Sequence, residues 1–170
     1  MEVLETKLDG VLLIKPYVFE DFRGQYIELY NEENYNKHGI NVKFVQDDVS
    51  HSTKNVVRGI HGDAETWKLI SCLKGRIYVV IVNCNEISKD FGKWQSFALS
   101  EINRHQILTP PKFGVSHLVL SDEAIFHYKQ STYYNPNVLK QFTYRYDDPR
   151  FNIYWPINNP ILSERDSMSK

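Results

Sequence analysis

The sequence predicts an all-β protein, either a sandwich or a small barrel. The chain has 170 residues, which is the length of one ordinary domain. Short segments rich in β-branched and aromatic residues recur along it, and turn-forming residues separate them at regular intervals. Only two stretches, 31–38 and 137–141, carry helical signals. Many short strands with few helices favour a sandwich or barrel over an α/β fold.

Nine segments have the composition of strands, and polar or glycine-containing turns separate them. Lys74-Gly75 stands between two apolar runs and predicts a tight hairpin turn. Residues 47–52 have the composition of a turn. The first helix has a capping candidate at Asn31, acidic residues in its first turn and Gly39 beyond its end. The predicted strands are Val11–Ile14, Tyr26–Tyr30, Val42–Gln46, Val56–Ile60, Lys68–Leu73, Ile77–Val82, Trp94–Leu99, Val115–Leu120 and Ile125–Gln130.

Composition excludes several classes of function. The formal net charge is -1, so the chain lacks the basic surplus of a nucleic-acid or anionic-membrane binder. A small anionic ligand stays possible, because two or three arginines suffice for it. The two cysteines lie in strand-like stretches without metal-ligand spacing, and no apolar run is long enough to span a bilayer. We therefore expect a cytoplasmic protein with reduced thiols.

The six histidines raise the question of a metal site. His61 has no second histidine two residues away, and only His117 and Glu65 are further candidates to join it. A catalytic metal site normally needs three well-placed protein ligands. We therefore expect no metal.

The segment Val57–His61 points to acid–base chemistry. Arg58 and His61 are three residues apart, so strict alternation places them on opposite faces of a strand. Gly59 between them allows a bulge that turns both to one side. An arginine that grips phosphate beside a histidine that titrates near neutrality suits proton abstraction from a phosphorylated substrate. On spacing alone, a half-buried histidine with a satisfied hydrogen bond is the competing interpretation of His61.

Two further side chains are candidates for a barrel interior. On the predicted strand 125–130, Phe126 and Tyr128 share one face, and His127 and Lys129 share the other. Tyr128 is either a proton donor or an aromatic with a satisfied hydroxyl. Lys68 opens an apolar run and is either a solvated edge residue or an ammonium aimed at a developing oxyanion.

Taken together and in order, a set of short motifs resembles the dTDP-4-dehydrorhamnose 3,5-epimerase (RmlC-like) family of metal-free cupins. The resemblance runs from about residue 7 to residue 166, and the ordered set is far more specific than any one motif. It implies a cupin or jelly-roll β-barrel with a few short helices over residues 1–170. The motifs include Asp21-Phe22-Arg23-Gly24, Phe44-Val45-Gln46-Asp47, Val57-Arg58-Gly59-Ile60-His61, Phe91-Gly92-Lys93-Trp94, Tyr133-Tyr134-Asn135-Pro136 and Leu162-Ser163-Glu164-Arg165-Asp166.

The resemblance implies epimerisation at C3, C5 or both of a nucleoside-diphosphate-linked 4-keto sugar. His61 would be the base, and Asp166 would orient and charge its imidazole. Tyr128 would return a proton from the other face of the ring. Lys68 would stabilise the enolate oxygen, and His117 would line the sugar pocket. No cofactor is implied, because removal and return of a proton leave the oxidation state unchanged.

The resemblance also implies the substrate-binding residues and a partner. Arg23 and Arg58 match arginines that bind the pyrophosphate, and Tyr134 matches an aromatic that stacks on the base. In the family an N-terminal segment crosses to a second copy, so a homodimer with that segment swapped is expected. The remaining expected substrate-binding residues are Tyr26, Glu28, Gln46, Asp48 and Arg165.

Two departures from the family pattern bear on the substrate. Gly62-Asp63 follows His61 where the family usually has an aromatic and glutamine, which predicts a roomier sugar pocket. Asp48 replaces an asparagine, and a carboxylate can accept the two N–H groups of guanine. We therefore expect a GDP-linked 4-keto-6-deoxy-heptose ahead of a dTDP-linked 4-keto-6-deoxyhexose. The alternative functions are a nucleotide-sugar 3,4-ketoisomerase and a non-catalytic nucleotide-sugar-binding cupin.

Overall fold

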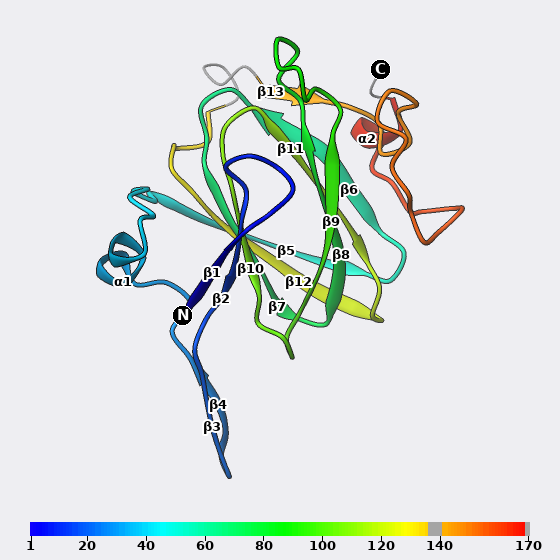
Figure 1. The fold of residues 1–170 in the computed structure, drawn as a ribbon. Coiled ribbons are helices and arrows are strands. Elements are labelled where there is room, and N and C mark those ends of the chain that lie inside the picture. The colour runs from blue at the N-terminus through cyan, green and yellow to red at the C-terminus, as the bar shows by residue number, and fades with distance from the viewer. Residues whose placement is uncertain (136–140, 169–170) are drawn as a thin grey trace.

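The computed structural model describes residues 1–135 and 141–168, which form two facing β-sheets with short helices at their margins (Figure 1). The predicted all-β class is confirmed. The six-stranded sheet has the order β1-β2-β10-β7-β12-β5, and the five-stranded sheet has the order β13-β6-β11-β8-β9. Strands that follow one another in the chain therefore often lie in different sheets, as a jelly roll requires.

The six strands of the larger sheet are β1 (Glu2–Glu5), β2 (Leu12–Lys15), β10 (Gln106–Thr109), β7 (Lys68–Lys74), β12 (Glu123–Gln130) and β5 (Gln46–Thr53). The smaller sheet contains β13 (Gln141–Thr143), β6 (Val57–Asp63), β11 (Phe113–Val119), β8 (Arg76–Asn83) and β9 (Trp94–Ser100). The remaining elements are the hairpin strands β3 (Val18–Asp21) and β4 (Gly24–Ile27) and the helices α1 (Glu32–Lys37) and α2 (Glu164–Met168).

The core between the two sheets follows from alternation along each strand. Ile70 of β7, Val79 of β8 and Ile107 of β10 are almost fully buried in one cluster. Val115 and Phe126 belong to the same cluster and also line a cavity between the sheets. The apolar core therefore forms part of the wall of that cavity.

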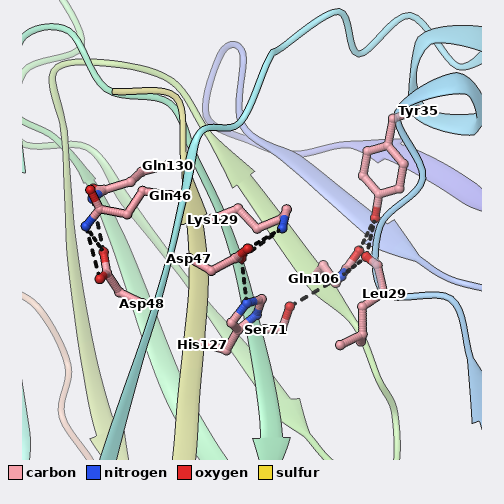
Figure 2. A network of polar contacts seen from close by, with 10 residues as sticks. All are labelled: Leu29, Tyr35, Gln46, Asp47, Asp48, Ser71, Gln106, His127, Lys129 and Gln130. Carbon is pink, nitrogen blue, oxygen red and sulfur yellow. Dashed lines mark hydrogen bonds and ion pairs between the residues drawn. The ribbon is translucent and has the colours of Figure 1, made fainter. Parts of the chain in front are cut away.

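Helix α1 is the predicted helix, and it packs outside the six-stranded sheet. The side chain of Asn31 accepts a hydrogen bond from the backbone N–H of Asn34, which caps the first turn. Tyr35 is buried, and its hydroxyl donates to Gln106 of β10. Gln106 in turn donates to the carbonyl of Leu29 at 2.8 Å (Figure 2). These contacts fix the segment between the hairpin and the sheet.

The hairpin β3–β4 projects away from both sheets (Figure 1). Its turn contains Phe22 and Arg23. The side chain of Phe22 is 97% exposed, and Arg23 is paired with Asp21 of the same hairpin, at 2.6 Å. Within one chain, the tip of the hairpin therefore contributes nothing to the core.

Three expectations about local structure are wrong. Lys74-Gly75 is not a hairpin turn, because β7 and β8 lie in different sheets. Residues 47–52 are not a turn but belong to β5, where alternate polar side chains face the interior or solvent. The strands expected at 26–30 and 42–46 coincide with β4 and β5 only at residues 26–27 and at Gln46. Strands β1, β3, β10 and β13, each three or four residues long, were not predicted.

The second expected helix, at 137–141, lies at 137–140 outside the described residues, and Gln141 begins β13. The polar C-terminal segment is joined to the fold through Ile161, whose carbonyl accepts from the N–H of Val57 at 3.0 Å. Neither α1 nor α2, within residues 1–135 and 141–168, has the length and apolar character needed to cross a membrane.

We predict that Gly75→Ala destabilises the fold more than Gly39→Ala. Both glycines have a positive φ, +75° and +82°, so each substitution costs about 1–2 kcal/mol in backbone strain. A Cβ at Gly75 would also collide with the carbonyl oxygen of Glu123, whereas a Cβ at Gly39 meets nothing within 4 Å. Displacing a packed backbone should add roughly 1–3 kcal/mol. Urea unfolding measures both, and equal losses would contradict the prediction.

Candidate active site

A cavity of about 330 Å³ opens between the two sheets beside α2. Its walls combine apolar side chains from the core with titratable side chains from both sheets and from the C-terminal segment. The lining residues are Ser50, Arg58, His61, Lys68, Ile70, Val115, His117, Phe126, Tyr128, Ser163, Arg165 and Asp166. Eight of the thirteen predicted site residues lie here or in an adjoining hollow, as described below.

Arg58 and His61 of β6 both line the cavity, because the strand departs from regular alternation at Gly59 between them. The pairing of β6 with β11 shifts register between Val115 and His117, as the expected bulge requires. Gly59 has φ +107°, and a Cβ there would collide with the carbonyl oxygen of Val115. Only glycine fits this position. Arg58 and His61 therefore line the same cavity.

The imidazole of His61 is bound to a buried carboxylate from the other end of the chain. His61 Nε2 lies 2.6 Å from Asp166 Oδ1, and Asp166 is only 2% exposed. Asp166 Oδ2 also accepts from the N–H of Gly59 at 3.3 Å. Burial raises the pKa of Asp166, but the hydrogen bonds from His61 and Gly59 outweigh it and hold the pKa below its usual value. An ionised Asp166 fixes the tautomer of His61, with the proton on Nε2 and the lone pair on Nδ1.

Tyr128 and Lys68 face His61 from the six-stranded sheet. Tyr128 lies on β12 and Lys68 on β7, and the Lys68 ammonium is 5.9 Å from the centre of the Tyr128 ring. Burial and the nearby carboxylate of Asp48 raise the pKa of Tyr128 to about 12. Burial also lowers the pKa of Lys68, against the charges of Asp63 and Asp48. The phenol is therefore protonated at neutral pH.

His117 is a buried, uncharged wall of the cavity. Its ring stacks on Phe126 with centroids 4.1 Å apart and planes 7° from parallel. Burial, then the positive charges of Arg58 and His61, lower its pKa to about 3, although Asp166 opposes this. Its Nε2 has no hydrogen-bond partner among the described residues. It lines the cavity as predicted and presents a neutral polar nitrogen.

A smaller hollow of about 130 Å³ adjoins the cavity and shares His61, Lys68 and Tyr128 with it. Tyr134 and Arg165 also line this hollow. Beside it lies a polar cluster in which Gln46 and Gln130 bind the carboxylate of Asp48 (Figure 2). Gln46 also accepts from the backbone N–H of Tyr134, at 2.9 Å. Three of the expected nucleotide-contact residues, Gln46, Asp48 and Tyr134, are thus neighbours.

The structure does not bring every predicted residue to the cavity. Arg23 and Tyr26 lie on the projecting hairpin, and Glu28 follows it directly. None of the three lines the cavity or the smaller hollow in the same chain. The hairpin that carries Arg23 and Tyr26 projects away from both sheets (Figure 1).

The roomier pocket expected from Gly62-Asp63 is absent. A Cβ on Gly62 would meet the ring of Phe142 and, at 2.5 Å, the carbonyl oxygen of Phe113. The place of the missing side chain is therefore filled. Asp63 is buried, and its Oδ1 accepts from the N–H groups of Glu65 at 2.9 Å and Thr66 at 2.7 Å. This aspartate caps the following turn.

Sequence reasoning missed several residues that support the site. Ser52 accepts from Nε of Arg58 at 3.0 Å, and Ser163 accepts from the N–H of Asp166 at 3.2 Å. Ser50 lines the cavity, and Gln130 binds Asp48. One signal was available in the sequence: Gln46, Asp48, Ser50 and Ser52 alternate with period two, which indicates a strand with one polar face.

Within the part of the chain that the structure describes, no three His, Cys, Asp or Glu side chains gather as metal ligands would. His61 is already bound to Asp166, and His117 stacks on Phe126.

Comparison with known proteins decides the family. The family model described as dTDP-4-dehydrorhamnose 3,5-epimerase matches residues 5–170. This chain belongs to that family. It is an isomerase of the epimerase type, and the resemblance of its motifs is confirmed.

Individual relatives in the family cover nearly the whole chain. The dTDP-4-dehydrorhamnose 3,5-epimerase of Escherichia coli (strain K12) is 39% identical over 98% of this chain and 91% of its own length. The Bacillus anthracis enzyme of the same name, solved with TDP and PPi bound, has a TM-score of 0.94 and 33% identity. The match covers 99% of this chain and 98% of the Bacillus anthracis chain.

A third relative was solved with a sugar nucleotide. The Legionella pneumophila dTDP-6-deoxy-D-glucose-3,5-epimerase, in complex with dTDP-4-keto-L-rhamnose, has a TM-score of 0.92 and 34% identity. The match covers 99% of this chain and 90% of that chain. The RmlC-like cupin fold expected from the motifs is therefore confirmed.

We predict that His117 stays neutral in the folded protein between pH 5.5 and 7.5. An unfolded histidine binds a proton near pH 6.5, whereas folded His117 does so only near pH 3. Stability from this residue is therefore complete above pH 7 and decreases as the pH falls, by about 1.4 kcal/mol between pH 7.5 and 5.5. Urea unfolding of the wild type and His117→Gln across this range measures the difference. Parallel pH curves would contradict the prediction.

Proposed function

We propose that this chain is a dTDP-4-dehydrorhamnose 3,5-epimerase, which inverts C3 and C5 of a dTDP-linked 4-keto-6-deoxyhexose. One observation supports the proposal above the rest. A carboxylate-bound histidine faces a protonated tyrosine and a lysine across one cavity, and the two sides come from opposite sheets. Inversion needs a base and an acid on opposite faces of the sugar ring, and this arrangement supplies them.

His61 removes the proton. Its Nε2–H donates to ionised Asp166, so Nδ1 carries the lone pair that takes the proton from the carbon next to the ketone. The C–H bond breaks, its electrons move into the ring, and the ketone oxygen becomes an enolate oxygen. Asp166 stabilises the imidazolium that results. A positioned base of this kind contributes roughly 10²–10⁴-fold to the rate.

Lys68 stabilises the enolate. Its side chain is largely enclosed and lies beside the Tyr128 ring, so its ammonium acts on the enolate oxygen with little screening by water. The neutral Nε2 of His117 offers a further polar contact to the sugar without adding charge.

Tyr128 returns a proton to the opposite face. Its phenol is protonated at neutral pH and lies on β12, across the cavity from β6. Donation to the carbanion carbon restores the ketone with inverted configuration and leaves a phenolate that solvent reprotonates, while the His61 imidazolium returns its extra proton to solvent. Proton removal by His61 and return by Tyr128, repeated at the second carbon, inverts both centres.

The nucleotide is held by groups at the mouth of the site. Arg58 and Arg165 line the cavity and are suited to the pyrophosphate, and Tyr134 lines the adjoining hollow where a base can stack. Thymine is favoured over guanine, because both Asp48 oxygens already accept from Gln46. With the bond from Gln130, the carboxylate already accepts three hydrogen bonds, which leaves too few of its roughly four acceptor positions for the two N–H groups of guanine. In the proposal, dTDP therefore replaces GDP and a hexose replaces the heptose.

We also propose a homodimer in which the β3–β4 hairpin of one chain completes the site of the other. The hairpin reaches away from its own cavity and exposes Phe19, Phe22 and Tyr26. Exposed aromatic side chains in such numbers are typical of a covered surface. Arg23 would then add a second cation at the partner's pyrophosphate.

Deuterium exchange tests the reaction. In D₂O, we expect the wild type to incorporate label at C3 and C5 of the dTDP-linked 4-keto sugar and to leave the GDP-linked sugar unlabelled. His61→Asn should abolish exchange, because it removes the base that takes the proton from the carbon in this proposal. Tyr128→Phe should retain exchange and lose inversion by at least 10²-fold.

NMR of the recovered sugar measures both label and configuration. No label in any 4-keto nucleotide sugar would overturn the epimerase proposal. Label at C3 alone would reduce the proposal to a 3-epimerase, and full activity of His61→Asn would show that the base is wrongly assigned. Movement of the ketone to C3 would indicate the 3,4-ketoisomerase alternative.

Complementation tests the swapped hairpin. We expect Arg23→Ala and His61→Asn homodimers to be nearly inactive, and co-refolding of equal amounts to restore about one quarter of wild-type activity. In a mixed dimer, one site combines the intact His61 of one chain with the intact Arg23 of the other. Each variant refolded alone is the control. No recovery despite mixed dimers would contradict a shared site.

A further inference from the structure

Asp47 and Asp48 are adjacent on β5, and their side chains point to opposite faces of the six-stranded sheet (Figure 2). Asp47 binds Lys129 at 2.7 Å and His127 at 2.9 Å. Asp48 instead accepts from Gln130 at 3.0 Å on the face toward the cavity. Successive side chains of a strand alternate in direction, so two neighbouring carboxylates have unrelated surroundings.

Asp48 lies directly opposite Tyr128 in the pairing of β5 with β12. Residues opposite each other in an antiparallel pair have Cβ atoms about 4.5–5.5 Å apart. Gln46 holds both carboxylate oxygens, at 3.1 and 2.9 Å, and Gln130 holds one of them. The two amides keep a negative charge fixed beside the phenol.

This charge acts on both groups that Asp48 faces. After burial, the Asp48 carboxylate is the next cause that raises the pKa of Tyr128. Together with Asp63, it also favours the charged form of Lys68, against the effect of burial. A negative charge at this position therefore favours a neutral phenol and a positive ammonium at once.

We propose that Asp48 is a positioning residue that keeps Tyr128 protonated and Lys68 charged when the substrate is bound. The proposal rests on the proposed function, in which Tyr128 gives a proton and Lys68 stabilises an enolate. Tyr134, beside the hollow, also raises the pKa of Tyr128. The other titratable groups facing the cavity are Arg58 and His61 from β6, His117 from β11, and Arg165 and Asp166 from α2.

The proposal determines how inversion depends on pH. When Tyr128 loses its proton to solvent, it has none to give, and the enolate regains its proton only from His61 on the original face. Exchange then continues without inversion. In Asp48→Asn, Tyr128 ionises at lower pH, so the ratio of inversion to exchange should fall at a lower pH than in the wild type.

A direct measurement on Tyr128 separates this proposal from the proposed function. Protein labelled with ¹³C at the tyrosine ring carbon that carries the hydroxyl is titrated by NMR, and Tyr128→Phe identifies the signal. In Asp48→Asn, we expect the pKa of Tyr128 to move from about 12 toward the ordinary value near 10. Burial still raises the pKa in this variant, so the shift should be partial, and at pH 11 a larger fraction of Tyr128 should be ionised in Asp48→Asn than in the wild type.

Asp47→Asn is the matched control, because it removes an equal charge one residue away on the other face. It should leave the Tyr128 signal and the inversion ratio unchanged. If Asp48→Asn fails to fold, as judged by circular dichroism, Asp48→Glu and Asp48→Gln give the same comparison of charge at equal length. An unmoved Tyr128 pKa in the uncharged variants, or an equal shift in Asp47→Asn, would overturn the proposal. If the Tyr128 pKa shifts in a protein that epimerises no sugar, the positioning role stands and the proposed function fails.

Discussion

The contact between His61 and Asp166 holds the site together. A carboxylate that is 2% exposed must be paired to stay ionised, and two of its partners, His61 and Gly59, lie on β6. This requirement binds α2 to the middle of a strand more than one hundred residues earlier. Ser163 and Arg165 are neighbours of Asp166 in the chain, so the contact that holds Asp166 also places these two residues in the cavity lining.

The topology distributes the reactive side chains over the two sheets. β6 and β11 belong to the five-stranded sheet and carry His61 and His117, whereas β7 and β12 belong to the six-stranded sheet and carry Lys68 and Tyr128. A ligand between the sheets meets a basic imidazole on one side and a protonated phenol on the other. Asp166 binds the imidazole on one side, and Asp48 raises the pKa of the phenol on the other.

The many aromatic side chains have several uses in the structure. Phe126 supports both the core and the stacked ring of His117. Tyr35 ties α1 to the sheet through Gln106, and so fixes the root of the hairpin. Phe19 and Tyr26 lie exposed on that hairpin, with ring centroids 6.3 Å apart. Apolar surface presented on a projecting arm is the physical reason to expect a second chain against it.

The sequence by itself determined the fold class, most of the longer strands, helix α1 and the small set of reactive side chains. Period-two patterning and capping at Asn31 are local signals, readable without knowing any contact. The ordered motifs then indicated roles for His61, Tyr128 and Asp166 that spacing alone left open.

The tertiary structure decided which residues from distant segments of the chain lie next to one another. Gly75 connects β7 and β8, which lie in different sheets. A Cβ at this position would collide with the backbone of Glu123 on another strand. Gly62 opens no pocket, because Phe142 occupies the place. Asp48 faces Tyr128, while Asp47 faces Lys129 on the other side. These outcomes depend on register and packing between segments far apart in the chain, and no local pattern contains that information.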